Sequence, residues 1–133
     1  MIKEKSFEEV LQRFREITFL ETFDIIVAIA NGGVIPAAII NQRLNKKIEL
    51  LKINLRDPNQ VPKYDNPKLV SPIDFEFKDK TILLVEDRIK TGATIQFAIE
   101  LLQGAKQIKT FAVNGKADYF LYDEPCFKFP WIL

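Results

Sequence analysis

Residues 82–94 read ILLVEDRIKTGAT and combine acidic and helix-opening residues in one short segment. Four apolar residues lead into Glu86 and Asp87, whose carboxylates can accept from a sugar diol and attract Mg²⁺, directly or through water. After three more residues, Thr91-Gly92-Ala93-Thr94 opens a predicted helix, where unpaired N–H groups and the helix dipole favour an anion. The alternative is an ordinary strand-to-helix turn with solvated acids. The combination favours a phosphate cradle beside a polyol or metal pair.

The residue types that are missing narrow the chemistry. The chain contains no histidine, which excludes Ser-His-Asp and Cys-His catalysis and His-ligated metal sites. Neither of its two serines, Ser6 and Ser71, lies in a nucleophile elbow, and the patterns GxxxxGK(S/T) and GxGxxG are both absent. Any catalysis must therefore use carboxylates, lysine, tyrosine, backbone amides or a hard metal ion.

The composition is that of one globular domain. With 133 residues and 47% hydrophobic content, we expect residues 1–133 to form a single domain with a substantial core. The net charge of +1 predicts no nucleic-acid or membrane partner. The single cysteine, Cys126, rules out an intramolecular disulfide and suits a reducing cytosol. Because the sequence also lacks a signal-peptide core and a membrane-spanning apolar run, we expect a cytoplasmic protein.

Apolar strands alternate with helical patterns along the chain. Four short apolar runs indicate buried strands, at 24–30, 48–55, 81–86 and 108–113. Helices are predicted after the capping box formed by Ser6 and Glu9, after Asn31-Gly32-Gly33, and over 94–103, where Gly104 ends the last one. This alternation predicts an α/β fold in which right-handed crossovers build a parallel β-sheet flanked by helices on both faces.

Two segments do not follow the alternation. Residues 55–74 carry four prolines and little periodicity, which is typical of a lid or a disordered segment. Residues 118–133 carry six aromatic side chains and finish without a charged one. Such an aromatic, uncharged tail suggests buried association, so we expect a homodimer.

These motifs together resemble the type I phosphoribosyltransferases. ILLVEDRIKTGAT closely resembles the family's motif for phosphoribosyl pyrophosphate (PRPP), and IVAIANGGVIPAAI, residues 26–39, looks like its pyrophosphate loop. Residues 55–74 take the place of its mobile catalytic loop. The tail ending in FPW is similar to the C-terminal hood of the xanthine/guanine enzymes and their relatives. The resemblance covers nearly the whole chain and implies the family's fold, with residues 115–133 as the hood.

The resemblance also implies a reaction and a role for each motif. A base nitrogen displaces pyrophosphate at the ribose C1 of PRPP, with Mg²⁺ bridging PRPP oxygens under a lid, and no protein nucleophile is needed. By motif position, Glu86 and Asp87 would hold the ribose hydroxyls and the metal, directly or through water. The residues implied for the 5′-phosphate are Lys90, Thr91, Gly92, Ala93 and Thr94; those for pyrophosphate are Ala30, Asn31, Gly32 and Gly33. In the lid, Lys63 and Tyr64 could close over PRPP.

The PRPP side departs from the family pattern at two positions, Lys90 and Asn31. Lys90 stands where the 6-oxopurine enzymes usually place an aspartate credited with proton transfer. An inward lysine would oppose a developing ribosyl cation, by roughly 4 kcal/mol at about 4 Å and intermediate dielectric. A lysine that points outward or reaches the 5′-phosphate would be harmless or helpful. Arg88 adds a second cation, and both can equally be surface residues. Asn31 replaces the Arg or Lys of many relatives and brings no charge.

The base side departs further. Val113 lies near the place of a purine-contacting lysine in the 6-oxopurine enzymes, and Lys116 follows three residues later as a possible substitute. Cys126 takes the place of an aromatic ring that relatives often stack on the base. Phe127 and Tyr119 are the candidates to replace that ring.

Three functions are therefore open. The leading one is a Mg²⁺-dependent phosphoribosyltransferase that uses PRPP and a nucleobase, with a purine preferred. The second is a non-catalytic regulatory protein that kept a PRPP or nucleotide pocket, which Lys90, Asn31 and Val113 favour. The third is a phosphoribosyltransferase for a non-purine acceptor.

Overall fold

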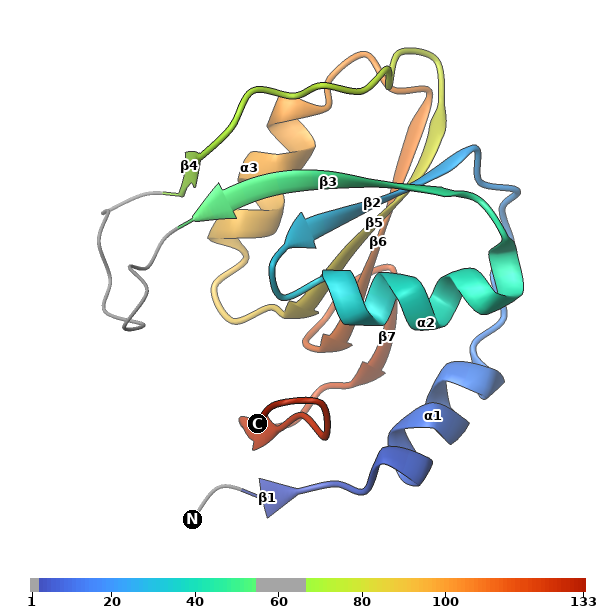
Figure 1. Cartoon of the computed structure of the whole chain (residues 1–133), viewed down its shortest axis with the longest axis vertical. Helices are drawn as coiled ribbons and strands as arrows, with labels where there is room; N and C mark the ends of the chain where they lie inside the picture. The colour runs from blue at the N-terminus through green and yellow to red at the C-terminus, as the bar shows by residue number, and fades with distance from the viewer. Residues whose placement is uncertain (1–2, 55–66) are drawn as a thin grey trace.

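The computed structural model describes residues 3–54 and 67–133, and its main feature is a six-stranded sheet (Figure 1). The strand order is β4-β3-β2-β5-β6-β7, and a separate small sheet pairs β1 with β8. The strands are β1 (Lys3–Glu4), β2 (Ile25–Ala30), β3 (Lys47–Asn54), β4 (Lys68–Leu69), β5 (Thr81–Arg88), β6 (Gln107–Asn114), β7 (Tyr119–Tyr122) and β8 (Phe127–Lys128). The helices are α1 (Phe7–Glu16), α2 (Val34–Leu44) and α3 (Ala93–Leu101).

The sheet is mostly parallel, as the alternating pattern predicts. Among the described strands, only the pairing of β3 with the two-residue β4 is antiparallel. All four predicted strands are present. The strand predicted over 81–86 continues to Arg88, because Arg88 still pairs with Asn114 of β6. Part of the tail also joins the main sheet as β7, which the sequence pattern did not predict.

Helices cover both faces of the sheet, which confirms the prediction (Figure 1). Successive side chains of a strand point to opposite faces, so each strand contributes to two cores. In β5, Leu83 and Val85 pack on the side of α1 and α2, whereas Ile82 and Leu84 pack on the side of α3. None of the helices in residues 3–54 and 67–133 is long and apolar enough to cross a membrane.

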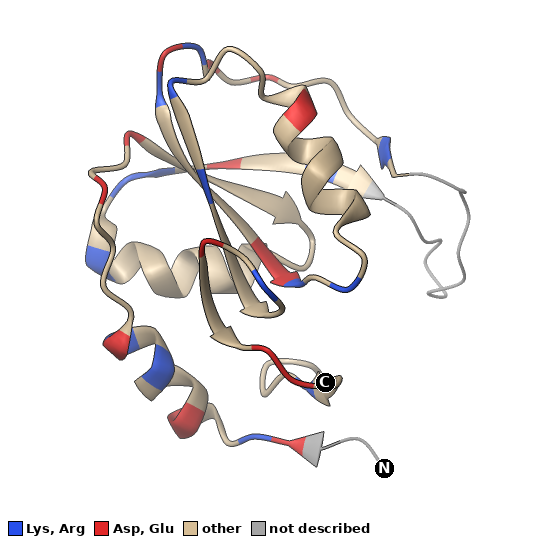
Figure 2. Ribbon diagram, turned by 180° about the vertical axis from the view of Figure 1, so that it is seen from behind, with Lys and Arg blue, Asp and Glu red and all other residues tan. Residues whose placement is uncertain are grey.

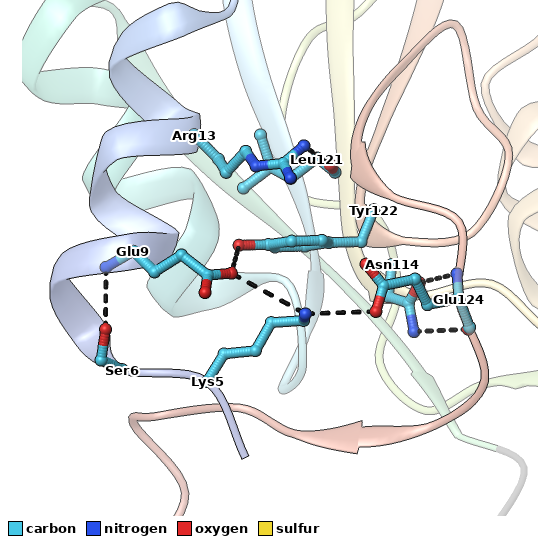
Figure 3. A network of polar contacts seen from close by, with 8 residues as sticks. All are labelled: Lys5, Ser6, Glu9, Arg13, Asn114, Leu121, Tyr122 and Glu124. Carbon is cyan, nitrogen blue, oxygen red and sulfur yellow. Dashed lines mark hydrogen bonds and ion pairs between the residues drawn. The ribbon is translucent and has the colours of Figure 1, made fainter. Parts of the chain in front are cut away.

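A polar network ties the N-terminal helix to β7 and the segment directly after it (Figure 3). Ser6 Oγ accepts from Glu9 N at 3.1 Å, which confirms the predicted helix cap. The Tyr122 hydroxyl donates to the Glu9 carboxylate at 2.6 Å, and Lys5 forms ion pairs with Glu9 and Glu124. The Tyr122 ring lies between the cations of Lys5 and Arg13, at 4.5 and 4.7 Å from its centroid. This network fixes β7 and the segment that follows it.

Candidate active site

The carboxyl ends of β2 and β5 meet at the centre of the sheet edge. These strands are parallel neighbours, with Ala28 opposite Val85, so the residues that follow them emerge side by side. A Cβ atom built at Gly32 would lie 2.6 Å from Asp87 Oδ1. The predicted pyrophosphate loop therefore touches the predicted acid pair. The peptide bond between Ala30 and Asn31 in this loop is cis.

Gly33, the next residue of the loop, lies against the backbone of β2 and β5. A Cβ atom there would come within 2.2 Å of the carbonyl oxygen of Val85 and 3.0 Å of that of Ile29. Both contacts are with backbone, which cannot swing aside as a side chain can. Gly33 is therefore required by the close approach of α2 to β5, and this approach brings the loop to the acids.

The acid pair lies in a partly buried setting at the end of β5. The Glu86 side chain is 8% exposed and accepts a hydrogen bond from Asp87 N at 2.9 Å. Asp87 Oδ1 accepts from Arg88 N at 2.6 Å. Burial, reinforced by the neighbouring Asp87 charge, raises the pKa of Glu86 well above its ordinary value. A ligand that brings hydroxyl donors or a cation would stabilise the ionised form of Glu86.

The donor set of this pair suits a hard cation. The described residues contain no cluster of three or more His, Cys, Asp or Glu that could cage a metal ion. Glu86 and Asp87 supply carboxylate oxygens, and Mg²⁺ is commonly held by one or two carboxylates together with substrate phosphates. The site therefore fits a Mg²⁺ ion that arrives with a phosphorylated ligand.

The loop after β5 forms the start of α3. Gly92 adopts φ +85°, a left-handed conformation, and serves as the N-cap residue of the nine-residue helix. Thr91 Oγ1 accepts a hydrogen bond from Ala93 N at 3.2 Å. No acidic side chain lies in the first turn of α3 to neutralise its positive end. This loop can therefore bind an anion, as the motif predicts for Lys90 to Thr94.

An open pocket of about 620 Å³ lies against this loop. One wall comes from the loop and α3, and the other comes from two charged residues beyond β6 and β7, Lys116 and Asp123. The lining residues are Ile89, Lys90, Thr91, Gly92, Ile95, Gln96, Lys116 and Asp123. Sequence reasoning missed Gln96 and Asp123. Gln96 lies inside the predicted helix, where no feature of the sequence singles it out. No local sequence signal marks Asp123, which reaches the pocket only through the path of the chain after β7.

Backbone and amide hydrogen bonds hold the second wall in place. The buried Asn114 side chain bonds both the N–H and the C=O of Glu124, at 2.9 and 3.0 Å. Gly115 N donates to the carbonyl of Tyr122, and Ile89 N donates to the carbonyl of Asn114. Lys116 and Asp123 therefore project from a closed loop anchored to β6 and to the segment after β5.

The predicted base-stacking residues are not brought to this pocket. Phe127 is 1% exposed and packs in the core with Phe129, so its ring has no free face for a base. The hydroxyl of Tyr119 accepts from Leu20 N and donates to Glu21, in the segment before β2. The structure therefore encloses Phe127 in the core and does not place Tyr119 among the residues that line the pocket. Cys126 is exposed and is not among the residues lining the pocket.

Three other predicted residues have clear positions, and two lie outside the described residues. Val113 is fully buried in the core, whereas Lys90 is exposed on the pocket wall. Arg88 is not a surface residue: it donates to the carbonyl of Phe127 at 2.8 Å and stacks 4.7 Å from the Phe129 ring. Its buried Nε has no partner within the described part of the chain. The lid residues Lys63 and Tyr64 lie outside the described residues.

Comparisons with known proteins find phosphoribosyltransferases over nearly the whole chain. The family model described as phosphoribosyl transferase domain matches residues 4–128. A xanthine-guanine phosphoribosyltransferase of Idiomarina loihiensis is 26% identical, with 95% of this chain and 84% of the relative covered. An orotate phosphoribosyltransferase of Pyrobaculum islandicum is 28% identical over 88% of this chain, but over only 54% of its own length. The crystal structure of a purine phosphoribosyltransferase from Pyrococcus horikoshii superposes with a TM-score of 0.78 at 26% identity, covering 98% and 94% of the two chains.

Proposed function

This chain belongs to the phosphoribosyl transferase domain family, and we propose that it transfers the ribose 5-phosphate group of PRPP to a ring nitrogen of a nucleobase. The observation that carries the proposal is the contact between Gly32 and the Asp87 carboxylate, beside the start of α3. A pyrophosphate, a diol and a monophosphate are the three polar parts of PRPP. The loop, the acid pair and the helix start offer one matching site for each.

Each group of residues has a defined task in this proposal. Glu86 and Asp87 accept hydrogen bonds from the ribose hydroxyls, which offsets the cost of a negative charge on the buried Glu86. Backbone N–H groups of residues 91–94 bind the 5′-phosphate. Residues 30–33 face the pyrophosphate, where Asn31 is exposed and offers an uncharged amide. No protein nucleophile takes part, which suits a chain without histidine.

Mg²⁺ is the metal that this site would take. The carboxylates of the acid pair would hold it directly or through water, and its chemistry when bound is to neutralise charge on the leaving pyrophosphate. In this proposal residues 55–74 form the lid over PRPP and residues 115–133 form the hood over the base. The protein is proposed to act as a homodimer in the cytoplasm.

A purine is the first candidate for the acceptor, because the relatives from Idiomarina loihiensis and Pyrococcus horikoshii act on purines by name. A second candidate function is PRPP binding without turnover. It is favoured by the exposed lysine on the pocket wall at position 90 and by the burial of Val113, which leave the acceptor side without the family's usual groups.

A pooled turnover assay separates these two functions. Purified protein, PRPP and Mg²⁺ are mixed with purine and pyrimidine bases, and mass spectrometry detects any nucleoside monophosphate. We expect a product, and a loss of about 10²-fold or more in kcat/KM for Asp87→Asn, because the pair contacts the reacting ribose. The control Glu100→Gln alters an exposed acid at the far end of α3 and should leave the rate unchanged. PRPP binding by calorimetry without product would favour a binding protein or an acceptor outside the pool, and absence of PRPP binding would overturn both functions.

A further inference from the structure

Arg88 follows the acid pair directly, and its cation lies in a largely apolar setting. Its side chain donates to the carbonyl of Phe127 at 2.8 Å, and its guanidinium carbon lies 4.7 Å from the centroid of the Phe129 ring. Both phenylalanines are buried. Among residues 3–54 and 67–133 the guanidinium joins no ion pair, and its buried Nε has no hydrogen-bond partner. Because an apolar side chain would fill this place without losing hydration, packing alone does not explain the arginine.

The strand register gives this contact a counterpart on the next strand. Arg88 of β5 pairs with Asn114 of β6. The Asn114 side chain bonds the N–H and the C=O of Glu124, at 2.9 and 3.0 Å (Figure 3). Two paired residues of the sheet therefore hold the two ends of one short segment, residues 124–127. Asn114 holds its first residue, and Arg88 holds its last residue, Phe127.

The segment between these anchors faces the open side of the site. Residues 123–126 are exposed, and Asp123, directly before the segment, lines the pocket of about 620 Å³ beside α3. In Figure 2 the acidic end of β5 is followed by basic residues, and the acidic stretch after β7 leads on to the end of the chain. Because Arg88 follows the acid pair without a gap, residues 124–127 are fixed relative to the carboxylates proposed to hold the ribose.

The order of the strands places this segment on the side from which the acceptor enters. The proposed pyrophosphate loop follows β2, the acid pair ends β5, and β6 lies on the opposite side of β5 from β2. A displacement at C1 brings the incoming nitrogen from the side opposite to the leaving pyrophosphate. The acceptor therefore approaches from the side of β6, where Asn114 and Arg88 hold residues 124–127.

We propose that Arg88 is a positioning residue for the acceptor, because together with Asn114 it clamps residues 124–127 beside the ribose. The inference rests on the proposed function and adds a residue to it. The contact of Arg88 with the PRPP side is its backbone N–H, which donates to Asp87 Oδ1 at 2.6 Å. Every residue type except proline carries that N–H, so a change of side chain leaves the PRPP side intact. The side chain acts on the acceptor through the carbonyl of Phe127.

Ligand binding measures the effect of the clamp without turnover. Ribose 5-phosphate fills only the PRPP side, whereas GMP, IMP and UMP also carry a base, so the ratio of the Kd values reports the acceptor side. We expect Arg88→Met to weaken the best-bound nucleotide by about 10- to 100-fold, the range of a hydrogen bond to a charged group. The Kd of ribose 5-phosphate should stay within about twofold. Arg88→Lys keeps a charged donor and should recover part of the loss.

Arg43→Met is the matched control. Arg43 donates to the carbonyls of Phe14 and Ile17, and its guanidinium lies 5.8 Å from the centroid of the Phe19 ring. The variant therefore loses the same kinds of contact, between α2 and the end of α1. It should lower Tm and leave the ratio of the Kd values unchanged.

A label on Cys126 reports the clamp directly. This single cysteine is exposed and lies inside the segment, so a nitroxide can be attached there alone. We expect its electron paramagnetic resonance spectrum to show greater mobility in Arg88→Met and in Asn114→Ala, but not in Arg43→Met.

The two measurements separate failure of this proposal from failure of the proposed function. A more mobile label together with weaker nucleotide binding supports the proposal even if no base is turned over, in which case only the transferase function fails. An unchanged label, or an equal loss of affinity for ribose 5-phosphate, overturns it. A more mobile label with unchanged nucleotide binding also overturns it, because the segment would then not serve the acceptor. The same holds if the parent protein binds the nucleotides no better than ribose 5-phosphate.

Discussion

The PRPP side and the acceptor side of the site are built in different ways. The PRPP side joins two neighbouring parallel strands and the residues directly after each, and its contact between Gly32 and Asp87 needs only the pairing of β2 with β5. The acceptor side is the segment that carries Lys116 and Asp123, which Asn114, β7 and α1 hold against the loop after β5. Local motifs therefore specify the first side, whereas contacts between distant parts of the chain specify the second.

The two sides also differ in charge. The PRPP side concentrates two carboxylates, and burial raises the pKa of Glu86. The acceptor side presents two exposed lysines and one exposed aspartate. The first side therefore presents negative charge, whereas the second presents one positive charge in excess.

The largest expected effect comes from the glycines of the PRPP side. Gly33→Ala places a Cβ against backbone atoms that cannot move aside, so we expect the free energy of unfolding to fall by about 3 kcal/mol. Gly32→Ala meets only the Asp87 side chain, so stability should change by less than about 1 kcal/mol while PRPP binding weakens. Denaturant unfolding and calorimetry measure the two quantities. A Gly33→Ala protein as stable as the parent would contradict the structural role assigned to this glycine.

An intermediate effect is expected from the acceptor side. Asn114→Ala leaves the N–H and C=O of Glu124 without their partner, which should cost about 1–3 kcal/mol of stability. Because the loop carrying Lys116 and Asp123 loses its anchor, the KM for the acceptor should rise while the Kd for PRPP stays unchanged. Gln103→Ala, at an exposed position after α3, is the matched control. An equal loss of PRPP affinity would show that the two sides are not separable.

The smallest effect is expected in the network between α1 and β7. Tyr122→Phe removes the hydroxyl that donates to Glu9, and we expect Tm to fall by about 3 °C. The same hydrogen bond lowers the pKa of Glu9, so it stabilises the fold above the ordinary pKa of this carboxylate, and the stabilisation is lost as the pH falls through the lowered value. The variant should therefore lose less stability than the parent between about pH 5 and pH 3. Identical pH profiles of Tm would argue against this contact.

The sequence by itself determined the four central strands, the cap at Ser6 and the PRPP motif. These features are local: apolar runs of strand length, a serine three residues before a glutamate, and acids directly after a strand. A buried parallel sheet places such acids at one edge, so the contact between the loop and the acid pair follows from the pattern.

Only the tertiary structure decided the acceptor side. Phe127 and Tyr119 were expected to stack on a base, but Phe127 is enclosed in the core and the hydroxyl of Tyr119 donates to Glu21. Arg88 reached Phe127 across 39 residues of sequence, and Asp123 joined the pocket from beyond β7. Aromatic and charged residues of a short tail carry no periodic signal for the direction in which they point. Their positions depend on the long-range contacts that close the chain.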